Sequence, residues 1–400
     1  MFIGRKHAAA AAVGVCALLL AACGSSDKGS TTTTGEVVFG MITDTSGGAS
    51  AYAPYSEVGI QMAIDEINAA GGISGKKIKL IKESDGSQST QTPTLARRLV
   101  DQGADVLLMN SGSASSIAVK PVCYQAKILC VAPTNLSDAI VAAPQQDNIW
   151  ILGPTSAGIG EIYAAGMAKA GVKRLAVISD DVPTIQSYVP ALVGAIQKGG
   201  IEQVANEKID PTGNDVSAQI ARVKASNPDA VLIMSLGGQA EVLVQNGLHQ
   251  QLPTVKRFGL ASIGNQPTTW DLADPGALEG LVVVGSVDKD NARTNDFIKK
   301  LTAIGGKYSV MTAYQPQGYD AVYMVKEAIE KAGGTSDLQK INDAFASITD
   351  YKPHYGRSDF SLSYSKDKHV GSNGNCGIVL MQFDSSNRPS KVWDTYQGSC

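Results

Sequence analysis

Hydrophobic residues along this chain follow two spacings, one typical of helices and one typical of buried strands. In the stretch "IDEINAAGGISGKKIKLI" (64–81) a helical pattern comes first, then three glycines, Gly71, Gly72 and Gly75, and then a strand. Phosphate-binding loops have the opposite order, with glycines between a strand and the helix that follows it. We therefore predict that Gly71 and Gly72 end the helix in a left-handed conformation and that the turn binds no phosphate.

The same order of elements occurs twice. The strands "VVFGMITDT" (37–45) and "KRLAVISDD" (173–181) each lead to a helix that ends in Gly-Gly, then to a strand, a helix and a buried strand. The buried strands are "ADVLLM" (104–109) and "DAVLIM" (229–234). Two such units predict an α/β protein with two Rossmann-like lobes, each built on an open parallel sheet with helices on both faces. Ligands bind such sheets beyond the carboxyl ends of the strands.

Composition excludes several classes of function. The chain has 400 residues, 44% of them hydrophobic, and its net charge of −3 gives no sign of a nucleic-acid surface. It contains no GxSxG or HExxH motif, so nucleophilic and zinc-dependent hydrolysis have no support. Gly158 and Gly160 precede a helix as in dinucleotide-binding enzymes, but the third glycine of that motif is missing. We expect no enzyme activity, no cofactor and no metal.

The N-terminus predicts export. Residues 1–22 combine a basic head with an apolar run that is too short for a membrane-spanning helix, which is typical of a signal peptide. The run ends in Leu20-Ala21-Ala22-Cys23, which resembles the lipobox of bacterial lipoproteins and implies cleavage before a lipid-bearing Cys23. The alternative is cleavage after Ala22 with an incidental cysteine. Residues 23–35 are polar and small, as in a flexible tether.

Outside the cytoplasm, cysteines tend to pair. Four remain beyond Cys16 and Cys23, and four cysteines allow three connectivities. Proximity in the sequence favours disulfides between Cys123 and Cys130 and between Cys376 and Cys400.

Four phrases carry a family resemblance: "VVFGMITDTSGG", "GIQMAIDEINAAGGISGKKIKL", "NPDAVLIMSLGG" and "QGYDAVYMVKEAIEKAGG". They resemble the branched-chain amino-acid-binding receptors of ABC importers, which are type I periplasmic binding proteins. The resemblance implies two lobes joined by three crossovers. We place the crossovers near Gly153, Gly285 and Arg357, which assigns residues 36–152 and 286–356 to lobe 1, and residues 153–285 and 357–400 to lobe 2.

Two polar turns of lobe 1 are the first candidates for ligand contact. "NSGSAS" follows the strand 104–109, and "PTNLS" (133–137) follows the strand "ILCVA". N–H groups and hydroxyls at the start of a helix suit a carboxylate. In the resembled family these turns hold the ligand carboxylate and ammonium, and Tyr52 and Tyr314 lie where aromatic contacts occur. The alternatives are helix capping for the hydroxyls and core packing for Tyr314.

Lobe 2 departs from the family pattern. Thr184 lies where many members have a tyrosine, and Ser262 lies at the position of the ammonium-binding acid. This weakens the case for an α-amino acid, although Asp180 or Asp181 could replace the missing charge. The alternative for both aspartates is a solvated loop end.

We predict an extracytoplasmic, lipid-anchored solute receptor that works as a monomer with an ABC transporter permease and binds a small polar or carboxylated, amino-acid-like solute. A sensor coupled to a membrane signalling partner is the alternative, because the fold serves both roles. Two glutamines would supply neutral hydrogen bonds in place of the missing acid. The predicted ligand contacts are Tyr52, Ser111, Gly112, Ser113, Thr134, Asn135, Ser137, Thr184, Gln186, Gln239, Ser262 and Tyr314.

Overall fold

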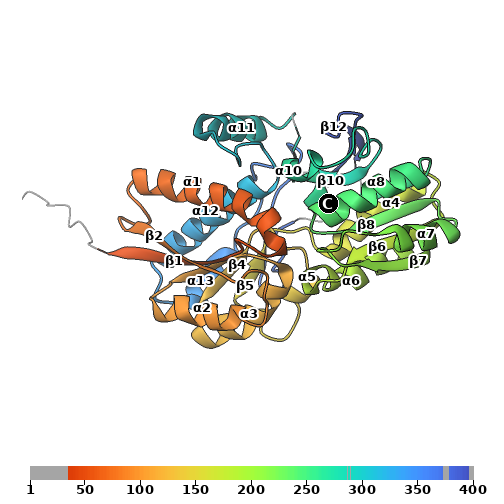
Figure 1. Cartoon of the computed structure of the whole chain (residues 1–400). Helices are drawn as coiled ribbons and strands as arrows, with labels where there is room; N and C mark the ends of the chain where they lie inside the picture. The colour runs from red at the N-terminus through yellow and green to blue at the C-terminus, as the bar shows by residue number, and fades with distance from the viewer. Residues whose placement is uncertain (1–34, 286, 289, 373–377, 396–400) are drawn as a thin grey trace, which may run out of the picture. The chain divides into compact units, whose positions relative to one another are not determined.

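The computed structural model describes residues 35–285, 287–288, 290–372 and 378–395 (Figure 1). The predicted signal peptide, Cys23, the tether up to residue 34, Cys376 and Cys400 lie outside the described residues. Within the described residues, no helix is both long and apolar enough to cross a membrane.

The first sheet has five parallel strands in the order β2-β1-β3-β4-β5. Alternate residues of β3 enter two cores, Val106 and Leu108 with helices α1, α12 and α13, and Leu107 and Met109 with α2 and α3. The predicted layering is therefore confirmed for this lobe (Figure 1). The strands are β1 (Glu36–Thr43), β2 (Lys77–Ser84), β3 (Val106–Asn110), β4 (Leu129–Ala132) and β5 (Ile149–Ile151), and the helices are α1 (Ala53–Ala69), α2 (Thr92–Asp101), α3 (Ser113–Ala126), α11 (Ala292–Ile304), α12 (Tyr314–Ala332) and α13 (Leu338–Ala346).

The second sheet has seven strands in the order β12-β11-β10-β9-β8-β6-β7. Five are parallel, but β11 and β12 form an antiparallel hairpin on the edge beside β10, which the sequence analysis did not predict. Helices α4 and α6 pack on one face, and α7 and α8 on the other. The strands are β6 (Arg174–Asp180), β7 (Glu202–Ile209), β8 (Ala230–Met234), β9 (Lys256–Gly259), β10 (Val282–Gly285), β11 (Val379–Phe383) and β12 (Pro389–Thr395), and the helices are α4 (Ser156–Lys169), α5 (Pro183–Gln186), α6 (Val189–Lys198), α7 (Ser217–Ala225), α8 (Gln239–Gln251), α9 (Ala261–Gly264) and α10 (Pro267–Trp270).

The chain passes between the two sheets three times. The first passage follows β5 and the second follows β10, near the expected Gly153 and Gly285. The third passage comes later than the expected Arg357, because Phe360, Leu362 and Tyr364 pack in the core of the first sheet. The backbone stays there as far as Val370, which bridges to Ile151 beside β5. We infer that lobe 1 extends to about residue 370 and that lobe 2 resumes with β11.

Two local predictions are confirmed. Gly71 and Gly72 have φ of +112° and +84° and link α1 to β2, and a Cβ on Gly72 would lie 1.9 Å from the carbonyl oxygen of Lys76. The two glycines are therefore required by the backbone conformation of this turn. Cys123 and Cys130 form a disulfide that joins the end of α3 to β4, with their Cα atoms 6.2 Å apart. The bridge between Cys376 and Cys400 stays a prediction.

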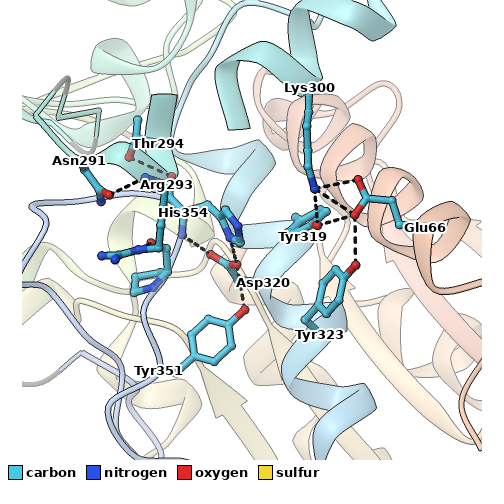
Figure 2. Close-up of polar contacts among 11 residues, drawn as sticks. Glu66, Asn291, Arg293, Thr294, Lys300, Tyr319, Asp320, Tyr323, Tyr351 and His354 are labelled. Atoms are coloured by element: carbon cyan, nitrogen blue, oxygen red, sulfur yellow. Dashed lines mark hydrogen bonds and ion pairs between the residues drawn. The ribbon is translucent and has the colours of Figure 1, made fainter. Parts of the chain in front are cut away.

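Glu66 ties three helices of lobe 1 together (Figure 2). Its carboxylate on α1 accepts hydrogen bonds from Lys300 of α11 at 2.9 Å and from Tyr319 and Tyr323 of α12 at 2.6 and 3.1 Å. Burial raises the pKa of Glu66, but these hydrogen bonds outweigh it and lower the pKa overall. The carboxylate therefore stays ionised and fixes α11 against the α1–α12 pair.

Asp320 fixes the segment that leads to the third passage (Figure 2). This buried carboxylate on α12 lies 2.6 Å from Nδ1 of His354 and accepts hydrogen bonds from the His354 N–H at 2.9 Å and the Tyr351 hydroxyl at 3.0 Å. The same segment accepts hydrogen bonds from Arg293 and Thr294 at the start of α11. Asp320 thus holds residues 351–354 against α12, and these residues in turn accept hydrogen bonds from the start of α11.

Helices α1 and α12 touch through glycines. A Cβ on Gly59 of α1 would lie 1.8 Å from the carbonyl oxygen of Gln315, and one on Gly318 of α12 would lie 2.4 Å from that of Ser56. Both helix backbones therefore meet without an intervening side chain. This contact sets the position of Tyr314, the first residue of α12.

We expect Gly59→Ala to destabilise the protein by about 1–3 kcal/mol, because the added methyl group must push two backbones apart. The control is Gly194→Ala in α6, where a Cβ meets nothing within 4 Å. That variant should be neutral or more stable by up to about 1 kcal/mol, since alanine is the better helix former. Thermal and urea unfolding measure both changes. Equal stability of the two variants would contradict the close contact.

Candidate functional site at the strand ends

The predicted ligand-contact turns come together where the carboxyl ends of the two sheets meet. The turn after β3 and the turn after β4 contribute from the first sheet, and the residues after β6, β8 and β9 contribute from the second. Apolar residues from both lobes share one cluster here, including Ala49 and Tyr52 from lobe 1 and Tyr188, Leu236 and Leu260 from lobe 2. The cleft is therefore lined by both lobes.

Ser111 holds the first-lobe side of the cleft in place. Its hydroxyl donates to the buried Asp85 at 2.7 Å, and its carbonyl accepts from the Asn135 amide at 2.9 Å and the Tyr52 hydroxyl at 3.3 Å. The Ser111 hydroxyl and the Asn135 amide are thus engaged within the protein. They position Tyr52 and the two turns rather than line the cavity.

Ten residues enclose a small cavity of about 20 Å³, which we call the tyrosine cavity. This volume is roughly that of one water-sized sphere. None of its lining residues in the described part of the chain is charged. They are Tyr52, Ser113, Thr134, Leu136, Thr184, Tyr188, Leu236, Leu260, Ser262 and Tyr314.

Three buried tyrosines dominate this lining. The rings of Tyr52 and Tyr314 lie 5.2 Å apart and are tilted by 33°. Burial raises the pKa of Tyr52, Tyr188 and Tyr314 above the ordinary value, and the neighbouring Asp44 and Asp85 raise that of Tyr52 further. All three are therefore neutral phenols at physiological pH. They offer apolar faces together with hydroxyl groups that can donate or accept.

The lining of the tyrosine cavity includes hydrogen-bonding groups without a partner among the described residues. The N-cap residue of helix α3 is Gly112, which has no side chain to accept a hydrogen bond. The first N–H groups of the helix therefore receive no side-chain cap. The hydroxyl of Thr134 is buried and has no hydrogen-bond partner among the described residues. Ser113 also lines this cavity, and its hydroxyl accepts from the Leu136 N–H at 3.3 Å. Such a group of donors suits a carboxylate.

A second, larger cavity of about 610 Å³ adjoins the tyrosine cavity and shares Thr184 and Leu236 with it. We call it the polar cavity. Its walls are the loops after β1, β2, β6, β7 and β8. It is lined by Ser46, Gly47, Gly48, Ser50, Ala51, Gly86, Ser87, Gln88, Ser89, Thr90, Asp180, Val182, Pro183, Thr184, Pro211, Thr212, Leu236, Gly237, Gly238 and Gln239.

The two candidate aspartates have different surroundings. Asp180 is fully buried and lines the polar cavity, so it is not a solvated loop end. Asp181 is exposed and pairs with Lys208 at 2.9 Å on the surface. Gln186 donates to the Asp180 carbonyl at 2.8 Å and lies in neither cavity lining. Asp180 is therefore the acid that the structure brings to the cleft.

The structure places the predicted residues in three groups. Six line the tyrosine cavity: Tyr52, Ser113, Thr134, Thr184, Ser262 and Tyr314. Gln239 lines the polar cavity, as Thr184 also does. Ser111, Gly112, Asn135, Ser137 and Gln186 lie beside the cavities without lining either. Sequence reasoning missed Tyr188 and Leu260, together with the loops at residues 46–51, 86–90 and 211–212. The strand-end rule, applied to β1, β2 and β7, would have found those loops.

The lobes touch each other beside the tyrosine cavity. A Cβ on Gly112 of lobe 1 would lie 2.4 Å from the Thr184 hydroxyl oxygen of lobe 2. Nearby, the Ser137 hydroxyl donates to the Ser187 carbonyl at 3.3 Å, and Asn265 accepts from the Ala313 N–H at 2.8 Å. The absence of a side chain at Gly112 allows this contact.

Residues 36–386 match the family described as periplasmic binding protein. The chain belongs to this family. Its type I architecture, with parallel sheets in two lobes, confirms the resemblance seen in the sequence. Its curated relatives are binding proteins, and this chain is a member of the same family of binding proteins rather than an enzyme.

Among the curated relatives of this periplasmic binding protein is the Leu/Ile/Val-binding protein BraC3 of Rhizobium johnstonii. It is 25% identical over 77% of this chain and 83% of its own length. The solved structure of LivJ from Streptococcus pneumoniae with isoleucine has a TM-score of 0.76 at 19% identity, covering 90% of this chain and 98% of that one. A solute-binding protein from R. palustris with 4-hydroxybenzoate also has a TM-score of 0.76, at 17% identity, covering 90% of this chain and 97% of that one.

We expect Gly112→Ala to shift the protein toward a more open arrangement of the lobes, because the new methyl group would occupy the space of the Thr184 hydroxyl. Small-angle X-ray scattering should then give a larger radius of gyration. In the double variant Gly112→Ala/Thr184→Ala the nearest Thr184 atom that remains is its Cβ, at 3.5 Å, so the original radius should return. Gly194→Ala is the control for an added methyl group elsewhere. An unchanged radius in the single variant would contradict this contact.

Proposed function

We propose that this chain is the solute receptor of an ABC importer and that it captures a small carboxylated solute between its lobes. The observation that carries the proposal is the lining of the tyrosine cavity. The lining includes the first residue of α3, a helix without a side-chain cap, and the Thr134 hydroxyl, which has no partner among the described residues. The other lining residues are tyrosines, leucines and small hydroxyl residues. This combination fits a carboxylate attached to an apolar or aromatic body.

The start of α3 would receive the carboxylate. N–H groups in the first turn of a helix carry partial positive charge, and Thr134 adds a hydroxyl donor that is otherwise unpaired. The 14 residues of α3 give it a full helix dipole. Among the described residues no cationic side chain lines this cavity, so backbone N–H and hydroxyl groups would bind the carboxylate.

The same lining disfavours an α-ammonium group. Ser262 lies at the family position of the acid, and its hydroxyl donates to the Ser235 carbonyl inside lobe 2. An ammonium buried beside Ser262 without a counter-charge would cost several kcal/mol, about enough to abolish useful affinity. The two structural relatives show that proteins of this fold bind either an amino acid or an acid without an amino group. The local lining therefore supports a solute without an ammonium group beside its carboxylate.

Lobe motion would admit the solute. Small-molecule pockets usually have about 300 Å³ or more, whereas the tyrosine cavity has about 20 Å³. A solute would bind first to the lobe 1 turns in a more open form and gain contacts with Thr184, Tyr188 and Leu260 on closure. Contacts that exist only in the closed form are what allow a ligand to shift the population toward it.

We expect 4-methylpentanoate to bind at least about tenfold more tightly than leucine, which differs from it by the α-ammonium group. It should also bind about tenfold more tightly than 4-methylpentanamide, because the amide lacks the negative charge that the start of α3 stabilises. Isothermal titration calorimetry measures all three affinities. Leucine binding as tight as that of the deaminated acid would contradict this proposal.

Thr134→Val tests the site within the same experiment, since it removes the unpaired hydroxyl at nearly constant volume. Binding of 4-methylpentanoate should weaken by about tenfold. Thr302→Val, on the exposed side of α11, is the matched control and should leave the affinity unchanged.

We also propose that the mature chain begins at Cys23 and is anchored to the membrane by lipid on that residue. The sequence Leu20-Ala21-Ala22-Cys23 after a short apolar run supports this. We expect Cys23→Ala to leave the protein unprocessed or to release it from membranes, measured by fractionation and intact mass. A variant that stays with the membrane at the same processed mass would exclude lipidation at this residue.

A further inference from the structure

Three acids lie at strand ends around the cleft, and two of them are fully engaged. Asp44 after β1 accepts hydrogen bonds from Ser46, Gly47 and Ser87. Asp85 after β2 accepts hydrogen bonds from Ser87, Thr92 and Ser111. Both oxygens of each carboxylate have partners. These two acids hold loops in place and have little capacity left for a ligand.

Asp180, the third acid, is different. Its Oδ2 accepts hydrogen bonds from the Ser235 hydroxyl at 2.9 Å and the Leu236 N–H at 2.8 Å. Its Oδ1 has no hydrogen-bond partner among the described residues, although the side chain is fully buried. An ionised carboxylate with an unpaired buried oxygen is costly unless a donor completes it.

The surroundings of Asp180 also favour a cation. Burial raises its pKa to about 6, and the hydrogen bonds from Leu236 and Ser235 oppose that rise, so the carboxyl is mostly ionised at neutral pH. Glu241 on α8 is buried nearby, and burial and then the charge of Asp180 raise its pKa. No lysine or arginine lines the polar cavity within the described residues. The negative charge at this end of the cleft is therefore not balanced by a basic residue of its lining.

The tyrosine cavity and the polar cavity share two lining residues, Thr184 and Leu236. Thr134 and Ser113 line only the tyrosine cavity, and Asp180 lines only the polar cavity. The first pair belongs to lobe 1 and Asp180 belongs to lobe 2. A solute with two charged ends would thus be held by a different lobe at each end.

Building on the proposed function, we propose that Asp180 determines specificity by pairing with a cationic group of the solute that is separated by several bonds from its carboxylate. The solute is then an ω-amino acid or a similar acid with a distant ammonium or guanidinium group, rather than an α-amino acid. An α-ammonium would lie near the carboxylate end of the cleft, away from Asp180. Because each charged end contacts a different lobe, binding of such a solute stabilises the closed form.

The test compares matched acids by calorimetry at neutral pH, using the ω-amino acids from 4-aminobutanoate to 6-aminohexanoate and the unsubstituted acids of equal length. We expect at least one ω-amino acid to bind about ten- to a hundredfold more tightly than its unsubstituted partner. 2-Aminopentanoate should show no such preference over pentanoate. Asp180→Asn should remove the preference, since the amide can still accept from Leu236 N–H but has no charge. Asp181→Asn, one residue further on the exposed surface, should keep the preference.

The outcomes separate the two proposals. If the unsubstituted acids bind but no ω-amino acid binds more tightly, the role of Asp180 is wrong and the carboxylate proposal stands. If no acid of either series binds, both proposals are wrong. A preference that persists in Asp180→Asn also overturns the role of Asp180. The wild-type comparison decides the solute class even if Asp180→Asn does not fold.

Discussion

Helices α1 and α12 approach so closely that neither can carry a side chain at Gly59 or Gly318. The rest of the cleft depends on this contact, because Tyr52 immediately precedes α1 and Tyr314 is the first residue of α12. Where the two backbones meet, the two rings lie 5.2 Å apart and are tilted by 33°. Further along the two helices, Glu66 of α1 accepts hydrogen bonds from Tyr319 of α12 and from Lys300 of α11. Helix packing in lobe 1 thus defines one wall of the binding region.

The acids around the cleft show how burial and hydrogen bonding divide similar residues into different roles. Asp44 and Asp85 directly follow parallel strands, Asp180 is the last residue of one, and all three are buried. The carboxylates of Asp44 and Asp85 accept hydrogen bonds from loop N–H groups and hydroxyls on both oxygens, and so hold the loops in place. Among the described residues, the Asp180 carboxylate accepts two hydrogen bonds, both on Oδ2, and the neighbouring Glu241 adds a second acid rather than a base. The three aspartates therefore differ in their hydrogen-bond donors and not in residue type.

Local patterns explain why much of the fold was predictable. Helical and strand spacing repeat in both halves, and the Gly71-Gly72 turn is encoded within a few residues. The antiparallel hairpin and the late third passage depend on contacts far apart in sequence, such as Val370 with Ile151, and no local signal marks them. The same limit applies in the cleft. Tyr52 and Tyr314 follow from the family resemblance, whereas the hydrogen bond from Ser111 to Asp85, 26 residues away, emerges only from the fold.

The hydrogen bonds that converge on Ser111 have a consequence for how this receptor can evolve. Its side chain and carbonyl connect Asp85, Asn135 and Tyr52, so a substitution at any of them disturbs several loops at once. Across the cleft, Leu236 and Leu260 line the cavity through side chains that make no hydrogen bonds, and each can change size without leaving a buried donor unpaired. Divergence toward new solutes should therefore accumulate on lobe 2 while the lobe 1 turns stay fixed. Different members of such a lineage would share one conserved half-site and differ in the other.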